Sequence, residues 1–206
     1  MKRLCMVGAS GHGRVCAEIA ELSGRYTDIF FLDDDIGIKN CGKYLVKGIV
    51  ENYREYIDNN TDFFVSIGNC SIRQRIQDEI AIAGGIIATL IHPQSVISKE
   101  TEIAEGTVIM AGAVINPGAI IGKGVILNTS SSVDHDCIVG DYTHISVGTH
   151  ICGTVNVGYI CLIGAGSTVI NNISITSNTI IGAGAVVVSD IDAPGTYVGI
   201  PAKRIK

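Results

Sequence analysis

One stretch of the chain, "LNTSSSVDHDCIVGDYTHISVGTHI" (residues 127–151), has an aliphatic residue at every sixth position. The same register continues on both sides of it without a slip, at Ile97, Ile103, Ile109, Ile115, Ile121, Leu127, Val133, Val139, Ile145, Ile151, Val157, Ile163, Val169, Ile175, Ile181 and Val187. A helix would need apolar residues three and four positions apart, so a strict period of six excludes one. A long fixed period instead predicts a solenoid, here a parallel β-helix in which each hexad supplies a short strand and a turn.

The period resembles that of the hexapeptide-repeat acyltransferases, whose left-handed β-helix closes one coil with three hexads, or eighteen residues. The ending "YVGIPAKRIK" (residues 197–206) is also similar to the C-terminal segment of that family. The left-handedness is implied by the resemblance alone, because most parallel crossovers are right-handed.

The first ninety residues follow a different pattern, in which strands alternate with helices. Apolar runs predict strands at 3–7, 29–32, 62–68 and 86–91, and helical spacing predicts helices at 14–23 and 71–84. This alternation predicts a small parallel sheet flanked by helices. We therefore expect an α/β Rossmann-like domain over residues 1–92, followed by a left-handed parallel β-helix with a C-terminal segment over residues 93–206.

Composition narrows the classes of function. The net charge is −5 and no basic patch is evident, so nucleic-acid binding is not expected. Glycine, serine and asparagine interrupt every apolar run before it is long enough for a membrane helix, and the N-terminus lacks a signal-peptide apolar region. The seven cysteines include no CxxC pair, which favours reduced thiols without a metal. We expect a cytoplasmic protein.

If eighteen residues close a coil, residues eighteen apart stack in columns. One column contains His135 and, one coil later, Gly153, which leaves space and an exposed backbone N–H beside the imidazole. A base near neutral pKa, room for a substrate and a donor for an oxyanion are what acyl transfer needs. The alternative is a surface histidine in a repeat turn. Asp134 and Asp136 can each raise the basicity of the imidazole and fix its tautomer.

A second column contains His144 among four aliphatic residues, Val108, Ile126, Leu162 and Ile180. These positions precede the inward aliphatic residues, so their side chains should point outward. An exposed apolar stripe of this kind usually marks an interface. We expect His144 to lie at an interface between subunits; the alternative is a polar residue that merely fills the column.

The glycine loop "GASGHG" (residues 8–13) joins the first predicted strand to the first helix, where backbone amides can bind phosphate. Asp33 follows the second strand at the position that commonly binds a ribose hydroxyl. The glycine spacing departs from the dinucleotide fingerprint G-x-G-x-x-G, which favours a nucleotide over NAD. A tight structural turn is the alternative, although an imidazole at His12 would contribute little to one.

Together, "GASGHG", "FLDDD", "SIGN", "NTSSSVDHDCIVGDYTHISVG" and "GIPAKRI" resemble the sialic acid O-acetyltransferase group of bacterial sugar acetyltransferases. The likeness is greatest to the UDP-4-amino-sugar N-acetyltransferases of bacillosamine-type pathways. This resemblance implies a homotrimer with active sites between subunits, a nucleotide sugar held by the N-terminal domain, and acetyl-CoA along the β-helix. From the cysteine spacing, we expect no metal.

The resemblance also implies roles for individual residues. His135 would be the general base and Asp136 would orient it, although the bacterial pattern commonly has Glu, one methylene longer, at that place. The acetyl-CoA groove or active site would be lined by Asn128, His144, Gly153, Ala165 and Ala183. The nucleotide sugar would be bound by Ser10, Gly11, His12, Asp33, Asp34, Gly68 and Asn69.

The sequence thus predicts direct acetyl transfer from acetyl-CoA to the amine of a nucleotide-linked 4-amino-deoxy sugar. No serine or cysteine stands in a nucleophile motif, which disfavours a covalent intermediate. Two alternatives stay open: O-acetylation of sialic acid or another sugar hydroxyl at the same site, and a non-catalytic trimer that only binds a nucleotide sugar.

Overall fold

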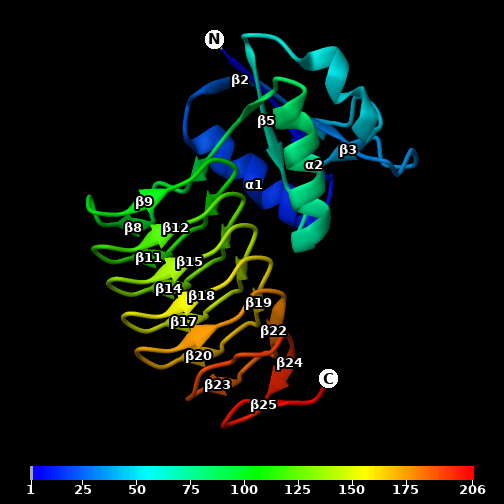
Figure 1. Cartoon of the computed structure of the whole chain (residues 1–206). Helices are drawn as coiled ribbons and strands as arrows, with labels where there is room; N and C mark the ends of the chain where they lie inside the picture. The colour runs from blue at the N-terminus through cyan, green and yellow to red at the C-terminus, as the bar shows by residue number, and fades with distance from the viewer. Residues whose placement is uncertain (1) are drawn as a thin grey trace. The chain divides into compact units, whose positions relative to one another are not determined.

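The computed structural model describes residues 2–206, and these form two compact units that divide between Pro93 and Gln94. The first unit is an α/β domain (Figure 1). Its elements are β1 (Lys2–Val7), α1 (Gly11–Leu22), β2 (Tyr26–Leu32), β3 (Asn40–Cys41), β4 (Tyr44–Leu45), the 3₁₀ helix η1 (Val50–Tyr56), β5 (Thr61–Val65), α2 (Cys70–Ile82), β6 (Ile86–Ile87) and β7 (Leu90–Ile91).

The sheet of the first unit has the strand order β2–β1–β5–β6, and every neighbouring pair is parallel. On one face of the sheet, alternate residues of β1, β2 and β5 pack against Tyr53 of η1 and against Ile76 and Ile80 of α2. The predicted small parallel sheet with flanking helices is therefore confirmed. It matters for function because the carboxyl ends of its parallel strands lie along one edge, where open α/β sheets bind ligands.

The predicted fourth strand, 86–91, is wrong as a single element. Only Ile86–Ile87 pairs with β5, and the chain leaves the sheet before a second short strand at Leu90–Ile91. Sequence reasoning also missed η1 and the hairpin of β3 and β4, whose turn contains Gly42 in the left-handed region. Strands of two residues are too short to show a period, so the turn residue was the only signal for this hairpin.

The second unit is a parallel β-helix whose coils stack in a regular succession (Figure 1). Its strands are β8 (Val96–Ile97), β9 (Glu102–Ile103), β10 (Val108–Ile109), β11 (Val114–Ile115), β12 (Ile120–Ile121), β13 (Ile126–Leu127), β14 (Ser132–Val133), β15 (Ile138–Val139), β16 (His144–Ile145), β17 (His150–Ile151), β18 (Asn156–Val157), β19 (Leu162–Ile163), β20 (Thr168–Val169), β21 (Ser174–Ile175), β22 (Thr179–Ile181), β23 (Val186–Val187), β24 (Gly195–Val198) and β25 (Lys203–Arg204).

Three parallel sheets form the faces of this unit, in the orders β10–β13–β16–β19–β22–β24, β8–β11–β14–β17–β20–β23 and β9–β12–β15–β18–β21. From β8 to β23 the strands pair with strands eighteen residues away, as Leu127 does with Ile145 and Ile145 with Ile163. The predicted left-handed β-helix is confirmed. The inward aliphatic residues from Ile109 to Val187 are buried and stack into one continuous core.

Buried hydroxyl groups link successive coils. Thr107 Oγ1 donates to the carbonyl oxygen of Gly122 at 2.8 Å and accepts from the N–H of Val125. Thr143, two coils further along, does the same with Gly158 and Cys161. Because each hydroxyl both donates and accepts, it is buried without an unmet hydrogen-bonding need. These bonds fix the turns relative to the strands, and so fix the columns that run along the solenoid.

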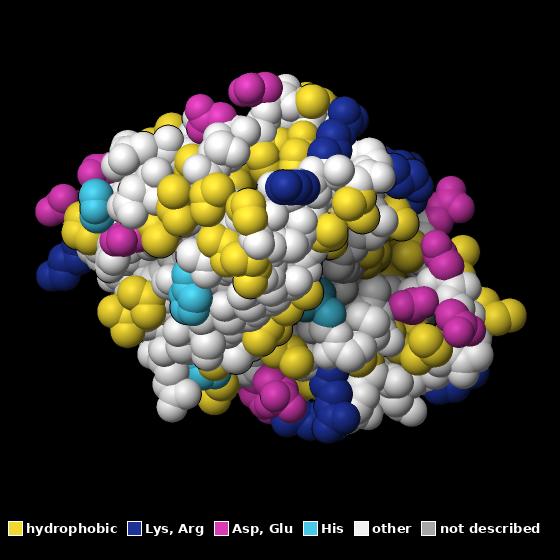
Figure 2. All heavy atoms as spheres, turned by 90° about the horizontal axis from the view of Figure 1, so that it is seen from below, with side chains coloured by type: hydrophobic (Ala, Val, Ile, Leu, Met, Phe, Trp, Pro, Cys, Tyr) yellow, Lys and Arg dark blue, Asp and Glu magenta, His cyan; other side chains and the backbone are white. Residues whose placement is uncertain are grey.

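The column that contains His144 has the predicted register, Val108–Ile126–His144–Leu162–Ile180. The prediction that its aliphatic residues face water is wrong for Val108 and Ile126, which are buried by other parts of the same chain. Leu162 is half-buried and Ile180 is 43% exposed. Apolar side chains also reach the surface on the face drawn in Figure 2, where charged groups lie mostly near the edges. The exposed part of the column is therefore its end nearest the C-terminus.

Among the helices within residues 2–206, none is both long and apolar enough to cross a membrane.

Candidate active site

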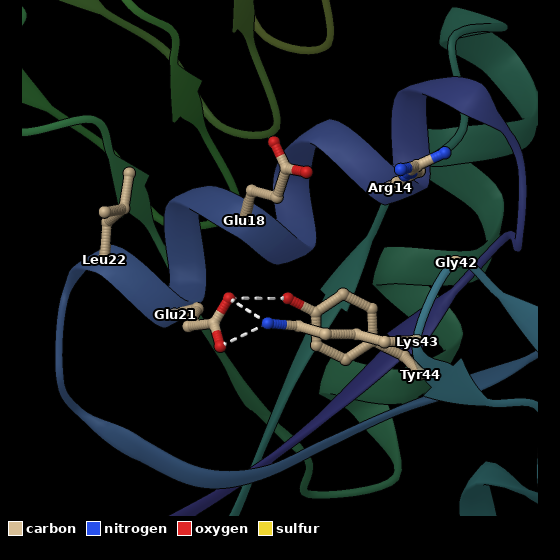
Figure 3. A pocket seen from close by; sticks show the side chains of 7 residues that line it. All are labelled: Arg14, Glu18, Glu21, Leu22, Gly42, Lys43 and Tyr44. Carbon is tan, nitrogen blue, oxygen red and sulfur yellow. Dashed lines mark hydrogen bonds and ion pairs between the residues drawn. The ribbon is translucent and has the colours of Figure 1, made fainter.

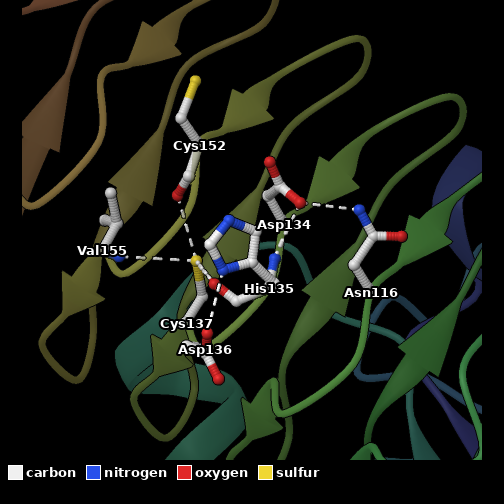
Figure 4. Close-up of polar contacts among 7 residues, drawn as sticks. All are labelled: Asn116, Asp134, His135, Asp136, Cys137, Cys152 and Val155. Carbon is white, nitrogen blue, oxygen red and sulfur yellow. Dashed lines mark hydrogen bonds and ion pairs between the residues drawn. The ribbon is translucent and has the colours of Figure 1, made fainter.

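His135 lies in the turn between β14 and β15, with its ring exposed to solvent. Its Nδ1 is 2.9 Å from Oδ2 of Asp136 (Figure 4). Asp136 has a φ of +56°, in the left-handed region that aspartate tolerates better than most residues. The shorter acid thus reaches the imidazole from a backbone conformation that suits it. An ionised carboxylate at Nδ1 favours a proton on that nitrogen, so Nε2 is left as the basic atom.

Asp134, on the other side of His135 in the chain, holds the backbone rather than the ring. Its Oδ1 accepts the backbone N–H of His135 at 2.8 Å and the Nδ2–H of Asn116, one coil earlier, at 2.7 Å (Figure 4). These two bonds, the one from Asn116 above all, hold the pKa of Asp134 below its ordinary value. The two acids beside the histidine therefore have separate tasks, and sequence reasoning did not identify Asn116.

The turn that carries His135 is also joined to the following coil, by the buried thiol of Cys137. Cys137 Sγ donates to the carbonyl oxygen of Cys152 at 3.0 Å and accepts the backbone N–H of Val155 at 3.4 Å (Figure 4). Burial raises the pKa of the Cys137 thiol, so it stays protonated and acts as a donor. Its role is to join two coils, which is a structural role.

The electrostatic surroundings make His135 a stronger base. The hydrogen bond to Asp136, and next the negative charge of Asp134, raise the pKa of His135 above its ordinary value of 6.5, against a smaller opposing effect of burial. A stronger base takes a proton more readily from a reacting group held beside it.

Two glycines, one on the coil before this pair and one on the coil after it, leave the space that the pair occupies. A Cβ on Gly118 would lie 2.6 Å from Oδ1 of Asp136, and a Cβ on Gly153 would lie 2.5 Å from Nε2 of His135. Gly153 is buried, and its backbone N–H makes no hydrogen bond within residues 2–206. The edge of the imidazole that carries the basic nitrogen therefore packs against the backbone of Gly153, whose N–H is unpaired within the described residues.

The residues predicted to line the acetyl-CoA groove lie at another corner of the coil. Asn128 Nδ2 and His144 Nε2 are 3.1 Å apart, and both are half-buried. Ala165 and Ala183 are exposed in the corresponding turns of the next coils. Asn128 belongs to the turn that enters β14, whereas His135 belongs to the turn that leaves it. One chain therefore does not bring this group of residues to His135; of the predicted groove residues, only Gly153 adjoins it.

The residues predicted to bind the nucleotide sugar lie at the carboxyl edge of the sheet in the first unit. Ser10 and Asn69 cap α1 and α2, their side chains accepting from the backbone N–H groups of Gly13 and Ile72. Gly11 and Gly68 adjoin these caps and are exposed. The two helices follow the neighbouring strands β1 and β5, so both helix N-termini face the same edge. This arrangement suits a diphosphate.

The two aspartates of this group are already engaged within the chain. Asp33 Oδ2 accepts the N–H of Ala9 in the glycine loop at 2.6 Å, and Asp34 Oδ1 accepts the N–H of Val50 at 2.9 Å. Asp33 thus shapes the glycine loop that faces it. A hollow of about 200 Å³ borders Asp33 at the end of β2.

His12 does not lie in a loop, as predicted, because α1 begins at Gly11 rather than at residue 14. The cap at Ser10 explains the earlier start, since its side chain satisfies a free N–H of the first turn. Burial, and next the positive charge of Arg73, lower the pKa of His12 to about 4. His12 is therefore uncharged near neutral pH, and its Nε2 lies 3.6 Å from the Sγ of Cys16.

A larger pocket of about 400 Å³ lies between α1 and the hairpin of β3 and β4, and none of the predicted site residues lines it (Figure 3). Within it, the carboxylate of Glu21 accepts from Lys43 Nζ at 2.6 Å and from the hydroxyl of Tyr44 at 3.1 Å. Within residues 2–206, no group of three or more His, Cys, Asp or Glu side chains is placed to hold a metal ion.

Replacing Asp136 with asparagine should lower the pKa of His135 toward its ordinary value, because the main cause of the raised pKa is removed. The imidazole would then lose its proton at a lower pH and be a weaker base. An NMR titration of the histidine side chains measures this, with the exposed Asp192→Asn as a control that should leave the pKa unchanged. An unaltered pKa in Asp136→Asn would show that the carboxylate does not act on the ring.

Comparisons with known proteins agree with this architecture. Residues 3–80 match the family model described as the PglD N-terminal domain. The chain is 35% identical to UDP-N-acetylbacillosamine N-acetyltransferase from Bacillus subtilis over 106 residues, which are 50% of this chain and 49% of that protein. The match thus spans about half the length of this curated relative.

Two solved structures extend the similarity over the whole chain. The acetyltransferase domain of PglB from Neisseria gonorrhoeae is 36% identical, with a TM-score of 0.96 and full coverage of both chains, and its complex with acetyl coenzyme A is equally similar in sequence. PerB from Caulobacter crescentus, solved with CoA and GDP-perosamine, is 31% identical, with a TM-score of 0.92 and coverage of 100% and 98%. The chain therefore belongs to the hexapeptide-repeat sugar acetyltransferases, the family of the bacillosamine-pathway enzymes.

Proposed function

We propose that this protein transfers the acetyl group of acetyl-CoA to the amino group of a nucleotide-linked 4-amino-deoxy sugar. The observation that carries the proposal is the His135–Asp136 pair, whose free Nε2 lies against the backbone of Gly153. Relatives named as N-acetyltransferases of nucleotide amino sugars, and the complexes of similar structures with acetyl-CoA or with CoA and GDP-perosamine, support it.

The reaction proceeds without a covalent enzyme intermediate. The uncharged sugar amine attacks the thioester carbonyl carbon, forming the C–N bond, while the electron pair of the carbonyl moves to oxygen. His135 Nε2 takes the proton from the amine nitrogen. The oxyanion then collapses, the C–S bond breaks, and the CoA thiolate leaves and is protonated by the imidazolium of His135. The backbone N–H of Gly153 is a donor for the oxyanion.

The first unit would hold the nucleotide sugar. The two helix N-termini capped by Ser10 and Asn69 suit its diphosphate, and Gly11 and Gly68 let the phosphates approach the backbone closely. Asp33 and Asp34 stand at the end of β2, where a ribose would lie. His12 would act as an uncharged hydrogen-bonding group, because its pKa of about 4 keeps it neutral.

The assembly would be a homotrimer with active sites between subunits. The base His135 lies at one corner of the solenoid, and the residues proposed for acetyl-CoA lie along another: Asn128, His144, Ala165 and Ala183. A neighbouring subunit can supply the second corner, which would complete the site.

Sedimentation equilibrium of the wild-type protein tests this assembly, because its molar mass distinguishes the states directly. A trimer mass at micromolar concentration is expected. A monomer that turns over at full rate at the same concentration would contradict a site shared between subunits.

A thiol-release assay with acetyl-CoA tests the activity, with a UDP-4-amino-sugar, a GDP-4-amino-sugar and sialic acid offered in turn. We expect turnover with a nucleotide amino sugar, and the panel identifies the nucleotide. Turnover with sialic acid alone would replace N-acetylation by O-acetylation. If no thiol is released with any acceptor but a nucleotide sugar still binds, the protein is a non-catalytic binding protein and the proposed activity is wrong.

The same assay tests the base. His135→Ala should lower kcat by about 10²–10⁴-fold, the usual contribution of a general base, and should still bind acetyl-CoA. His150→Ala is the matched control, since His150 is an exposed histidine on β17 of the same solenoid. A kcat near that of the wild type in His135→Ala would remove His135 from the mechanism.

A further inference from the structure

Asn171 continues the column of His135 and Gly153 along the solenoid. The three residues hold the same position in the turns of successive coils, eighteen residues apart. Backbone hydrogen bonds stack these turns: Thr154 N–H donates to the carbonyl oxygen of His135 at 2.9 Å, and Asn172 N–H donates to that of Gly153 at 3.1 Å. A side chain at position 171 therefore stands two coils from the imidazole, with only a glycine between them.

The carboxamide of Asn171 and the basic nitrogen border the same space. A Cβ on Gly153 would lie 2.5 Å from Nε2 of His135 and 3.2 Å from Nδ2 of Asn171. Both polar atoms therefore lie close to the Cα of Gly153, at the volume that a side chain there would occupy. Asn171 is exposed, and its side chain makes no hydrogen bond to another of residues 2–206.

Two observations argue against a role for Asn171 in the turn itself. Asparagine often stabilises a turn by adopting a positive φ, but here Asn172 does so, with a φ of +60°, and Asn171 does not. A turn side chain can also cap the following backbone N–H, as Asp134 does for His135 at 2.8 Å. No such bond from Asn171 is present among the described residues. The carboxamide is thus free to bind a ligand.

The backbone of Gly153 offers a second donor at the same place. In other turns the equivalent backbone N–H donates to the side chain of the preceding residue. The N–H of His135 donates to Asp134, and the N–H of Thr129 donates to Asn128 Oδ1 at 2.8 Å. Gly153 follows Cys152, and no residue of the described chain accepts from its N–H. One side-chain amide and one backbone amide next to the base make the donor pair that is typical of oxyanion holes.

We infer that Asn171 is a catalytic residue whose Nδ2–H group, with the N–H of Gly153, binds the oxygen of the thioester carbonyl as it becomes negatively charged. The inference rests on the proposed acetyl transfer and adds a residue to it. As the amine attacks, the C=O electron pair moves to oxygen and the two donors stabilise it. As the C–S bond breaks, the C=O bond re-forms and the interaction weakens. The stabilisation is therefore greatest at the transition state.

Asn171→Leu tests this inference, because leucine has a similar volume and no donor. Removing one oxyanion donor should lower kcat by about 100-fold or more, while KM for both substrates stays close to the wild-type value. Asn171→Ala should show the same fall in kcat, which would show that the fall in Asn171→Leu is not a steric effect of leucine. Asn156→Leu is the matched control, since Asn156 is an exposed asparagine on β18 of the same solenoid, and its kcat should be unchanged.

The outcomes separate this inference from the proposed function. A wild type without turnover would overturn both. An active wild type, an inactive His135→Ala and a kcat within about threefold of wild type in both Asn171 variants would overturn only the role of Asn171. A rise in KM with kcat unchanged would also overturn it, because a group that binds substrate and transition state equally does not raise kcat. Thermal melting of each variant, compared with that of Asn156→Leu, shows whether a loss of kcat reflects unfolding.

Discussion

The eighteen-residue register of the β-helix is the constraint on which the rest of the second unit depends. Each inward aliphatic residue, such as Ile145, packs between its copies one coil before and after, and backbone hydrogen bonds join the same residues. A shift of one residue would turn the buried side chains outward, so packing strongly disfavours any other register. The turns are held to the same repeat, and a side chain in a turn therefore has a fixed neighbour on each side.

His135 shows how a regular scaffold gives one residue an irregular environment. The repeat stacks His135 on Gly153, whose missing side chain leaves room for the imidazole. It stacks the next residue, Asp136, on Gly118, whose missing side chain leaves room for the carboxylate. Asp136 then bonds to Nδ1, and Asn116 holds Asp134 against the backbone. The imidazole is thus supported by residues from three successive coils without any departure from the repeat. Its chemistry comes from which residues occupy the columns, because the backbone geometry is the same along the solenoid.

Much of this could be predicted from the sequence because a strict period translates directly into neighbours. The register at Leu127 and Ile145, and the pairing of His135 with Gly153, followed from spacing once the coil length was known. The burial of outward-facing residues could not be predicted in this way, because spacing gives the direction of a side chain but not what covers it. Val108 and Ile126, for example, are covered by the rest of the chain. In the first unit, the cap at Ser10 draws His12 into α1, a local bond that an apolar pattern cannot reveal.

If acetyl transfer takes place where the imidazole of His135 meets the backbone of Gly153, the variant Gly153→Ala should disrupt it. Gly153 does not have a positive φ, so alanine fits the backbone, but its Cβ would lie 2.5 Å from Nε2 of His135. We expect a fall in kcat of about 100-fold or more, since displacing a reacting group by about 1 Å has that effect, with the melting temperature and the affinity for the nucleotide sugar retained. A folded Gly153→Ala protein with a kcat near that of the wild type would contradict it.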